Sequence, residues 1–273
     1  MILLWGLFVL SLGTSAFFFT FFEFYTTWYW YFLLIPFMIG SFILWSGIYA
    51  LIMVIGACIL RLRNKPGSNS KFLYFFVKQT AYFIYFYCNI KVKVINKNIE
   101  PKEKCMIIAN HRSNFDPFLF YRTTKTFPLA GVTKPGNLEV PIFGWWIKYT
   151  GSIVIDKDDN FAAVKSIATA IKDIRDGISS VLIYPEGKRV FDEGMIDFHP
   201  GSFKIATKSK CPILVASTKG TNDVKNRFQR RSHVTLKYIK VVTYDEYKDM
   251  NTQELAKYCH DLIYNDLYGE TNK

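Results

Sequence analysis

The chain has 273 residues, 50% of them hydrophobic, and carries a formal net charge of +12. The charge is divided unevenly. Residues 1–60 contain no Lys or Arg and a single acid, Glu23, so all 34 basic residues and the other 21 acids lie in residues 61–273, which carry +13. This pattern argues against a uniformly soluble protein. It indicates a membrane protein whose soluble part faces an anionic surface or anionic substrates.

The five cysteines are spread along the chain, and no two have the spacing of a metal-binding or redox pair. They are Cys58, Cys88, Cys105, Cys211 and Cys259. We therefore expect reduced thiols, in a reducing compartment, that serve as packing residues.

The N-terminal segment has room for two membrane spans, because residues 1–22 and 24–60 are uncharged and about 20 apolar residues cross a bilayer core. We place the spans near residues 2–22 and 33–60. A single span from about 38 to 60, with the first segment dipping into one leaflet, is the alternative. A cleaved signal peptide is disfavoured, because a basic leader is missing and a long apolar stretch follows.

Basic residues follow the last span at once, and juxtamembrane cations stay on the cytoplasmic side. We therefore expect an integral protein of the cell membrane with three parts. Residues 1–62 would form the anchor, and residues 63–89 a hinge followed by an aromatic helix. That helix, near 72–89, would lie in the headgroup plane or pack on the body. Residues 90–273 would form the cytosolic body.

The body alternates between strand-like and helix-like segments. Such alternation predicts an α/β fold, a layered and mostly parallel sheet with flanking helices. The strands are expected at 91–96, 105–110, 128–133, 152–156, 180–184, 213–217 and 234–242, and the helices from 117, over 160–176, near 200–210, and after a cap at Asn251 and Glu254.

The stretch NHRSNFDP (residues 110–117) places a histidine and an aspartate five residues apart. On a regular helix His111 and Asp116 would lie about 140° apart and would not meet. If Asp116 is the N-cap and the helix begins at Pro117, the preceding residues can turn, so that the carboxylate orients the imidazole as a base. Alone, this short pattern is more typical of a capped turn with an exposed histidine.

Other polar groups also follow predicted strands closely. IYPEGKR (183–189) combines a glycine turn with Lys188 and Arg189, which suits a phosphate, although alone such a charged turn is more typical of a solvated surface. TGSIVIDK (150–157) ends in Lys157, and Lys134 follows another strand. In parallel α/β sheets, ligands bind at the carboxyl ends of the strands. The sequence therefore predicts a site for a phosphate-bearing ligand beside His111.

The blocks NHRSNFDP, TGSIVIDK, YPEGKR and CPILVAS, in this order, resemble those of the glycerolipid acyltransferase family, and most of all its bacterial lysophosphatidic acid acyltransferases. The resemblance covers about residues 90–220. It implies a membrane-bound O-acyltransferase that moves a fatty acyl group from a thioester to the sn-2 hydroxyl of lysophosphatidic acid.

The resemblance also implies roles for single residues. His111 would be the general base and Asp116 its partner. The acceptor phosphate would be bound by Lys134, Lys157, Lys188 and Arg189. The acceptor site would be shaped by Gly151, Glu186, Gly187 and Pro212.

Three positions depart from the family pattern. Lys157 stands where the family usually has arginine, which replaces a planar fork with a point charge. Lys188 stands where threonine is common, and Val190 where serine is common. These changes affect the expected identity of the acceptor more than the expected reaction.

The expected mechanism is direct transfer without a metal or other cofactor. The expected partners are membrane lipids, lysophosphatidic acid and an acyl donor, which is a coenzyme A thioester or acyl carrier protein; no nucleic acid is expected. Another acceptor, such as glycerol-3-phosphate or another lysophospholipid, is an alternative. So is a non-catalytic, membrane-tethered module that binds anionic lipid. The sequence leaves the acyl chain length and the oligomeric state open.

Overall fold

The computed structural model describes residues 2–63, 71–126, 128–156, 159–191, 194–224 and 231–269. The chain divides into two compact units, Met1–Lys65 and Pro66–Lys273. The predicted hinge at 63–70 lies almost wholly outside the described residues. Each unit is described by itself below.

The first unit is a helical hairpin. Helix α1 (Ile2–Phe21) and helix α2 (Leu34–Arg63) pack together and are joined by two short 3₁₀ segments, Phe24–Thr26 and Trp28–Leu33. Both stretches are long and apolar enough to cross a membrane, with mean hydropathies of 2.0 for Ile2–Phe21 and 2.3 for Tyr31–Leu62.

Polar side chains pair between the two helices of the hairpin. The hydroxyls of Ser11 and Ser41 are 2.8 and 3.1 Å from the Met38 carbonyl oxygen and 2.7 Å from each other. The indole N–H of Trp45 donates to the Thr14 hydroxyl at 3.1 Å. In an apolar medium such groups need a protein partner, so these bonds favour association of the two helices.

In the second unit, helix α3 (Lys71–Tyr87) packs against the body along one face, where Leu73, Tyr74, Ala81 and Tyr85 are buried. The Tyr74 hydroxyl donates to the carbonyl of Thr150 at 2.6 Å. The Tyr85 hydroxyl donates to the carbonyl of Phe115, inside the NHRSNFDP stretch, at 3.0 Å. The aromatic helix therefore supports the turn that carries His111.

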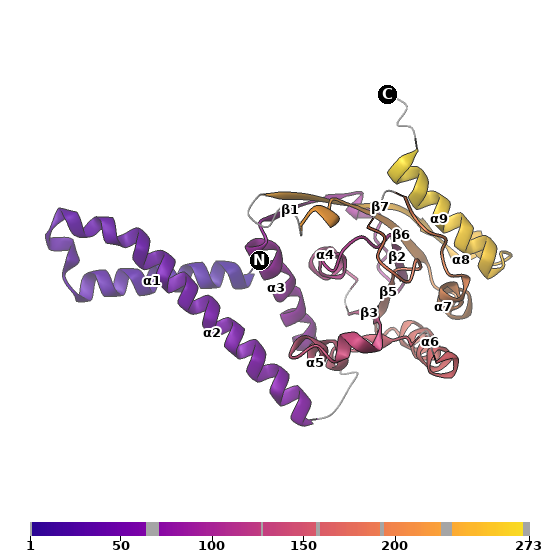
Figure 1. The fold of residues 1–273 in the computed structure, drawn as a ribbon, viewed down its shortest axis with the longest axis horizontal. Coiled ribbons are helices and arrows are strands. Elements are labelled where there is room, and N and C mark those ends of the chain that lie inside the picture. Colours follow the sequence, from indigo (N-terminus) through magenta and orange to yellow (C-terminus); the bar gives the residue numbers. More distant parts are fainter. Residues whose placement is uncertain are drawn as a thin grey trace. The chain divides into compact units, whose positions relative to one another are not determined.

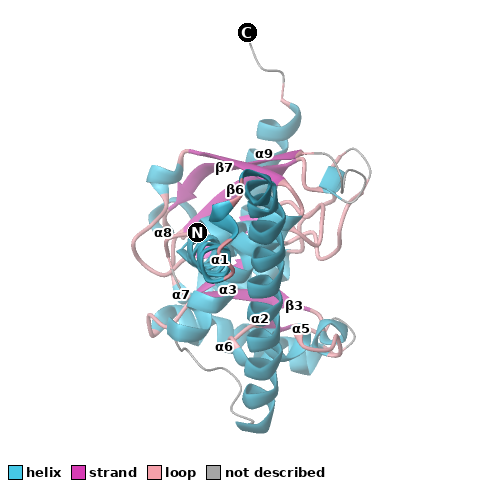
Figure 2. Ribbon diagram, turned by 90° about the vertical axis from the view of Figure 1, so that its left-hand side faces the viewer, coloured by secondary structure: helices cyan, strands magenta, loops and turns pink. Residues whose placement is uncertain are grey.

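The second unit is built on a seven-stranded sheet with the order β1-β7-β6-β2-β5-β3-β4 (Figures 1 and 2). All paired strands are parallel except β6 and β7, which are antiparallel. The strands are β1 (Ile90–Ile95), β2 (Met106–Ala109), β3 (Leu129–Thr133), β4 (Ile153–Val154), β5 (Ser180–Ile183), β6 (Ile213–Lys219) and β7 (Ser232–Val242). This arrangement confirms the predicted mostly parallel α/β sheet.

The helices cover both faces of the sheet (Figure 1). They are α4 (Asp116–Thr123), α5 (Phe143–Tyr149), α6 (Asn160–Arg175), α7 (Lys204–Ser209), α8 (Tyr244–Tyr247) and α9 (Thr252–Tyr268), with 3₁₀ turns at Lys97–Ile99, Pro135–Leu138, Pro200–Phe203 and Asn222–Val224. Two hydrophobic cores result. One lies between the sheet and α6, α7 and α9, and the other between the sheet and α3 and α4.

Strand β2 lies in the middle of the sheet and all four of its residues are buried. Met106 and Ile108 contribute to one core, and Ile107 and Ala109 to the other. A strand covered on both faces reads as a continuous apolar run, as this one does. The residues that follow β2 therefore emerge from the buried centre of the sheet.

Most predicted strands agree with the structure to within one or two residues at each end, and two further differences concern β4 and the start of helix α4. Strand β4 has only two residues, Ile153–Val154, where 152–156 was expected. Helix α4 begins at Asp116 rather than Pro117, and Phe115 occupies the N-cap position without a side-chain cap. Asp116 is therefore not the N-cap, because its carboxylate bonds to the turn that precedes the helix.

Candidate active site

The carboxyl ends of β2, β5 and β3 lie side by side, because these strands are neighbours and parallel. His111 follows β2 by two residues, Glu186 follows β5 by three, and Lys134 directly follows β3. The topology therefore brings the histidine motif and the PEGKR segment to one edge of the sheet. That is the edge where parallel α/β sheets bind their ligands.

Asn110 anchors the turn that carries His111. Its side chain is completely buried, and its Nδ2 donates to the carbonyl of Thr218 at 3.0 Å. The backbone N–H of Thr218 donates in return to Asn110 Oδ1 at 2.8 Å. This two-way bond ties the end of β2 to the end of β6, so the position of the turn is fixed before any substrate binds.

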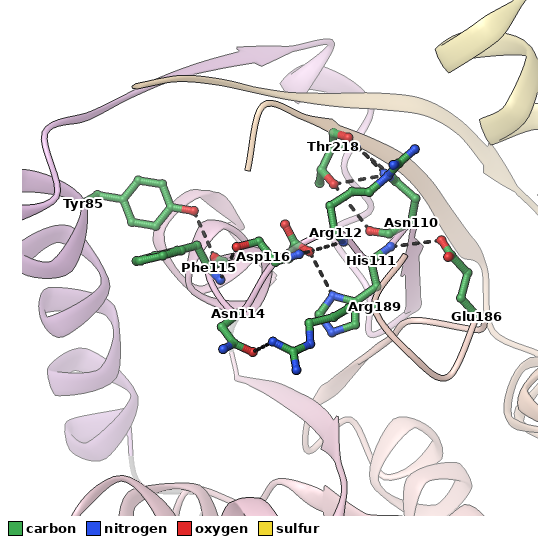
Figure 3. Close-up of polar contacts among 11 residues, drawn as sticks. Tyr85, Asn110, His111, Arg112, Asn114, Phe115, Asp116, Glu186, Arg189 and Thr218 are labelled. Carbon is green, nitrogen blue, oxygen red and sulfur yellow. Dashed lines mark hydrogen bonds and ion pairs between the residues drawn. The ribbon is translucent and has the colours of Figure 1, made fainter. Parts of the chain in front are cut away.

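Asp116 and His111 meet across the turn (Figure 3). Oδ2 of the fully buried Asp116 lies 2.9 Å from His111 Nδ1 and accepts the backbone N–H groups of Arg112 and Ser113, both at 2.7 Å. The other carboxylate oxygen, Oδ1, has no hydrogen-bond partner among the described residues. Because that carboxylate accepts a bond from Nδ1–H, the other ring nitrogen, Nε2, has a free lone pair and can act as a base.

The segment after β5 holds the backbone of His111 on both sides. The His111 N–H donates to Glu186 Oε1 at 3.0 Å, and the His111 carbonyl accepts from the N–H of Val190 at 2.9 Å. Two of the predicted blocks, 75 residues apart in the chain, are thus joined through the backbone of one residue.

Glu186 is 1% exposed, and burial raises the pKa of its carboxyl to about 7. Its Oε1 accepts the His111 N–H, whereas Oε2 has no hydrogen-bond partner among the described residues. Burying a carboxylate with one oxygen unpaired is costly, so the protonated form is favoured up to near neutral pH.

Arg189 reaches across to the histidine motif. Its Nη1 donates to Asn114 Oδ1 at 2.8 Å (Figure 3). Its guanidinium carbon lies 5.3 Å from the ring centroid of Phe191. Arg189 and Lys188 are exposed, and Gly187 takes a left-handed φ of 67° that turns the chain toward them. An exposed guanidinium next to the base is suited to a phosphate, which it can bind through two parallel bonds.

The remaining predicted site residues are placed as follows. Lys134 is exposed at the carboxyl end of β3, and Lys157 lies outside the described residues. Gly151 precedes the short strand β4 with a φ of 82°. Pro212 does not join the site, because it precedes β6, which is parallel to β2, and its carbonyl accepts the N–H of Met106 at the opposite edge. A role for Pro212 in shaping the acceptor site is thus not supported by its position.

Tyr184 belongs to the site, and sequence reasoning missed it. Its ring stacks on the imidazole of His111 with centroids 4.2 Å apart and an interplanar angle of 16°. Burial raises the pKa of its hydroxyl well above the usual value, so the ring stays neutral. In the sequence, the one signal for a role of Tyr184 at the site is its position directly before Pro-Glu-Gly.

A second group that sequence reasoning missed surrounds Arg112. Nη2 of Arg112 donates to the carbonyl of Gly194 at 2.7 Å and to the hydroxyl of Tyr268. That hydroxyl also donates to the Gly194 carbonyl at 3.0 Å. Tyr268 is the last residue of α9, so the C-terminal helix helps to hold the loop after Arg189. No local pattern signals a contact between residues 156 positions apart.

We expect the Asn110→Ala variant to lower the free energy of unfolding by about 2–4 kcal/mol, because two buried backbone groups of Thr218 lose their partners. Asn114→Ala is the matched control, since Asn114 is exposed and loses only the bond to Arg189. It should cost about 0.5 kcal/mol or less. Unfolding of the detergent-solubilised proteins in urea measures the change in unfolding free energy for each variant. Equal changes in Asn110→Ala and Asn114→Ala would contradict the anchoring role of Asn110.

We expect the wild-type protein to lose stability relative to Glu186→Gln as the pH rises between about 4.5 and 7. In this window the unfolded carboxyl ionises while the folded one stays protonated, so the unfolded state is favoured. Above pH 7 both are ionised and the difference becomes constant. Thermal unfolding of both proteins across the window tests this, and a stability difference that does not vary with pH would contradict it.

Comparisons with known proteins agree with this geometry. Residues 91–219 match the family model described as Acyltransferase. The 1-acyl-sn-glycerol-3-phosphate acyltransferase of Salmonella typhimurium is 28% identical over 157 residues, which are 57% of this chain and 64% of that protein. The protein of the same name from Escherichia coli is 26% identical over 157 residues, with the same coverage. A probable 1-acyl-sn-glycerol-3-phosphate acyltransferase of Mycoplasma genitalium is 28% identical over 177 residues, 60% of this chain and 64% of that protein.

The chain therefore spans about 64% of the length of these curated relatives. Among solved structures, the 1-acyl-sn-glycerophosphate (LPA) acyltransferase PlsC of Thermotoga maritima matches with a TM-score of 0.64 and 22% identity, covering 84% of this chain and 95% of that one. This likeness shows the same fold. The matched segment, residues 91–219, contains His111, Asp116, Glu186 and Arg189, so the part of the chain that carries the site is similar to the acyltransferase family.

Proposed function

We propose that the protein transfers a fatty acyl group from a thioester to the sn-2 hydroxyl of lysophosphatidic acid, giving phosphatidic acid. The observation that carries this proposal is the bond of 2.9 Å between His111 Nδ1 and the buried Asp116 carboxylate. It leaves an oriented base at the ligand-binding edge of the sheet, beside the exposed Arg189. The names of the relatives support the choice of acceptor.

The reaction proceeds by direct attack. His111 Nε2 takes the proton of the acceptor hydroxyl while that oxygen attacks the thioester carbonyl, and Asp116 stabilises the imidazolium that forms. The new C–O bond replaces the C–S bond as the tetrahedral intermediate collapses. The imidazolium then returns the proton to the leaving thiolate. The proton stays within the two substrates and His111, so this route uses no metal or other cofactor.

The phosphate of the acceptor is bound by cations around the base. Arg189 is the principal ligand, because its position is fixed through Asn114 in the same motif as His111. Lys188 and Lys134, both exposed at this edge, add positive charge, and Lys157 is a further candidate from the sequence. A phosphate held there places the glycerol hydroxyls of a lysolipid within reach of His111.

The apolar helices α1 and α2 anchor the protein as membrane spans, with the body on the cytosolic side. Both have the length and hydropathy of a span, and Arg61 and Arg63 follow the apolar part of α2. Juxtamembrane cations of this kind remain cytoplasmic. In this orientation the enzyme meets lysophosphatidic acid in the cytosolic leaflet and its acyl donor in the cytosol.

The donor is either a coenzyme A thioester or an acyl carrier protein. An assay that crosses these two donors with lysophosphatidic acid, glycerol-3-phosphate and a second lysophospholipid separates the possibilities. Turnover confined to lysophosphatidic acid supports the proposal. Turnover confined to another acceptor would contradict the proposed acceptor but still support acyl transfer. Binding of anionic vesicles without turnover of any pair would favour a lipid-binding module.

We expect His111→Ala to lower kcat/KM for lysophosphatidic acid by about a thousandfold or more, because the base is removed. Asp116→Asn should lower it by about as much, because the amide cannot hold the imidazole in the same tautomer. The assay uses purified protein in detergent, with thermal unfolding to show that each variant is folded. Normal turnover by a folded His111→Ala variant would refute the mechanism.

We expect Arg189→Ala to raise KM for the acceptor by about tenfold or more while KM for the donor stays unchanged, because we assign Arg189 to the phosphate of the acceptor and not to the donor. Arg189→Lys should recover part of the loss, since the charge remains but the planar fork is gone. The matched control is Arg231→Ala, because Arg231 is an exposed arginine that also bonds to an asparagine, Asn89, away from the site. A rise in KM for the donor alone would contradict this role.

A further inference from the structure

Tyr184 lies against the face of the catalytic histidine. The two rings are nearly parallel, at 16°, with centroids 4.2 Å apart. Phe120 of α4 packs edge-on against Tyr184, at 6.4 Å and 68°, and is itself completely buried. The Tyr184 ring is thus held in place from behind while its face is turned to the imidazole.

We propose that Tyr184 is a positioning residue whose ring face fixes the plane of His111 and stabilises its imidazolium as the acceptor proton is transferred. The expected effect of Tyr184 on the reaction rate rests on the proposed function. Its expected effect on the orientation and charge of the His111 ring does not.

The physical reason is a difference between two states of the imidazole. Before reaction the imidazole is neutral and the stacked ring offers packing alone. After proton transfer it is a cation above an electron-rich ring face, an attraction that operates within about 6 Å of the centroid. Tyr184 therefore stabilises the charged state more than the neutral one, and only such differential stabilisation accelerates a reaction.

The ring and Asp116 act from different directions. Asp116 accepts a bond in the plane of the imidazole, at Nδ1, whereas Tyr184 contacts the face. Together they restrict both rotations of the imidazole, so that Nε2 points to the acceptor. Tyr184 can fix the plane of the imidazole in this way without contacting Nε2 itself.

The hydroxyl of Tyr184 is dispensable in this account. It is buried and has no hydrogen-bond partner among the described residues. Removing it leaves the ring face in place and relieves an unpaired polar group. Tyr184→Phe therefore keeps the proposed function of the residue, whereas Tyr184→Leu removes the face and keeps the apolar volume in part.

The first experiment follows the titration of His111 by NMR in histidine-labelled protein. The chain has only four histidines, so His111→Gln identifies the signal. We expect Tyr184→Leu to move the midpoint of His111 to lower pH by about half a unit to one unit and to abolish the upfield ring-current shift of its ring protons. Tyr184→Phe should match the wild type in both respects. An unmoved midpoint in Tyr184→Leu, or an equal shift in Tyr184→Phe, would overturn the proposal.

A structural control separates this role from general packing. Phe120→Leu removes the aromatic ring behind Tyr184 but does not remove a ring that contacts His111. It should lower Tm as Tyr184→Leu does, without moving the titration of His111 beyond about 0.2 units. If Tyr184→Leu does not fold, Tyr184→Met supplies the same comparison, because methionine fills irregular space without a ring. A shift in Phe120→Leu as large as in the Tyr184 variants would assign the effect to packing.

The second experiment is the pH–rate profile for lysophosphatidic acid. We expect Tyr184→Leu to lower kcat by about three- to tenfold and to shift the acid limb of the profile to lower pH, while Tyr184→Phe restores both. Because the NMR titration needs no substrate, it remains informative if lysophosphatidic acid is not the acceptor. A titration that behaves as expected, with no turnover in any variant, would reject the proposed function and leave the stacking role of Tyr184 intact.

Discussion

One oxygen atom of Asp116 accepts hydrogen bonds from the imidazole of His111 and from the backbone N–H groups of Arg112 and Ser113. The same three bonds close the turn after β2 and orient the base, so the local fold and the chemistry cannot be changed independently. Helix α4 can begin at Asp116 because the carboxylate points back into this turn. An aspartate used as an ordinary N-cap would instead bond forward, to the first turn of its helix, and would leave the histidine without a partner.

The site as a whole depends on bringing three separate segments to that turn. Asn110 joins it to β6, Glu186 and Val190 join it to the segment after β5, and Tyr85 reaches it from α3. Each of these bonds uses a backbone group of the turn or a buried side chain. The base is thus held by groups that are already paired in the free protein, which is the arrangement expected of a preorganised active site.

The alternation of strand-like and helix-like segments predicted the mostly parallel sheet. The pairing of His111 with Asp116 needed more than this pattern, because the short motif alone is more typical of a capped turn, and the prediction relied on the other blocks and on the family resemblance. Local chemistry also predicted the start of the last helix, where Asn251 and Glu254 form the expected capping box. These features depend on residues within a few positions of one another, so the sequence contains their causes.

Features set by long-range contacts could not be predicted in the same way. The stacking of Tyr184 on His111 and the bond between Arg112 and Tyr268 depend on how distant elements pack. Pro212 was assigned to the site from its motif, but the direction of β6 places it at the other edge. Strand β4 pairs with β3 over only two residues, Ile153 and Val154, an extent that its apolar run did not reveal.

The pairing of β1 with β7 has a consequence for the order in which the protein assembles. β1 is the first strand of the body, and its hydrogen-bonded partner is the last, with Ile90 opposite Ser232. At a synthesis rate of about 5–20 residues per second, β1 waits roughly 7–30 s on the ribosome for that partner. The two apolar helices, each long enough to cross a membrane, are made before β1. The body therefore completes its sheet only after β7 has been made, so the edge of β1 stays unpaired while the rest of the domain is synthesised.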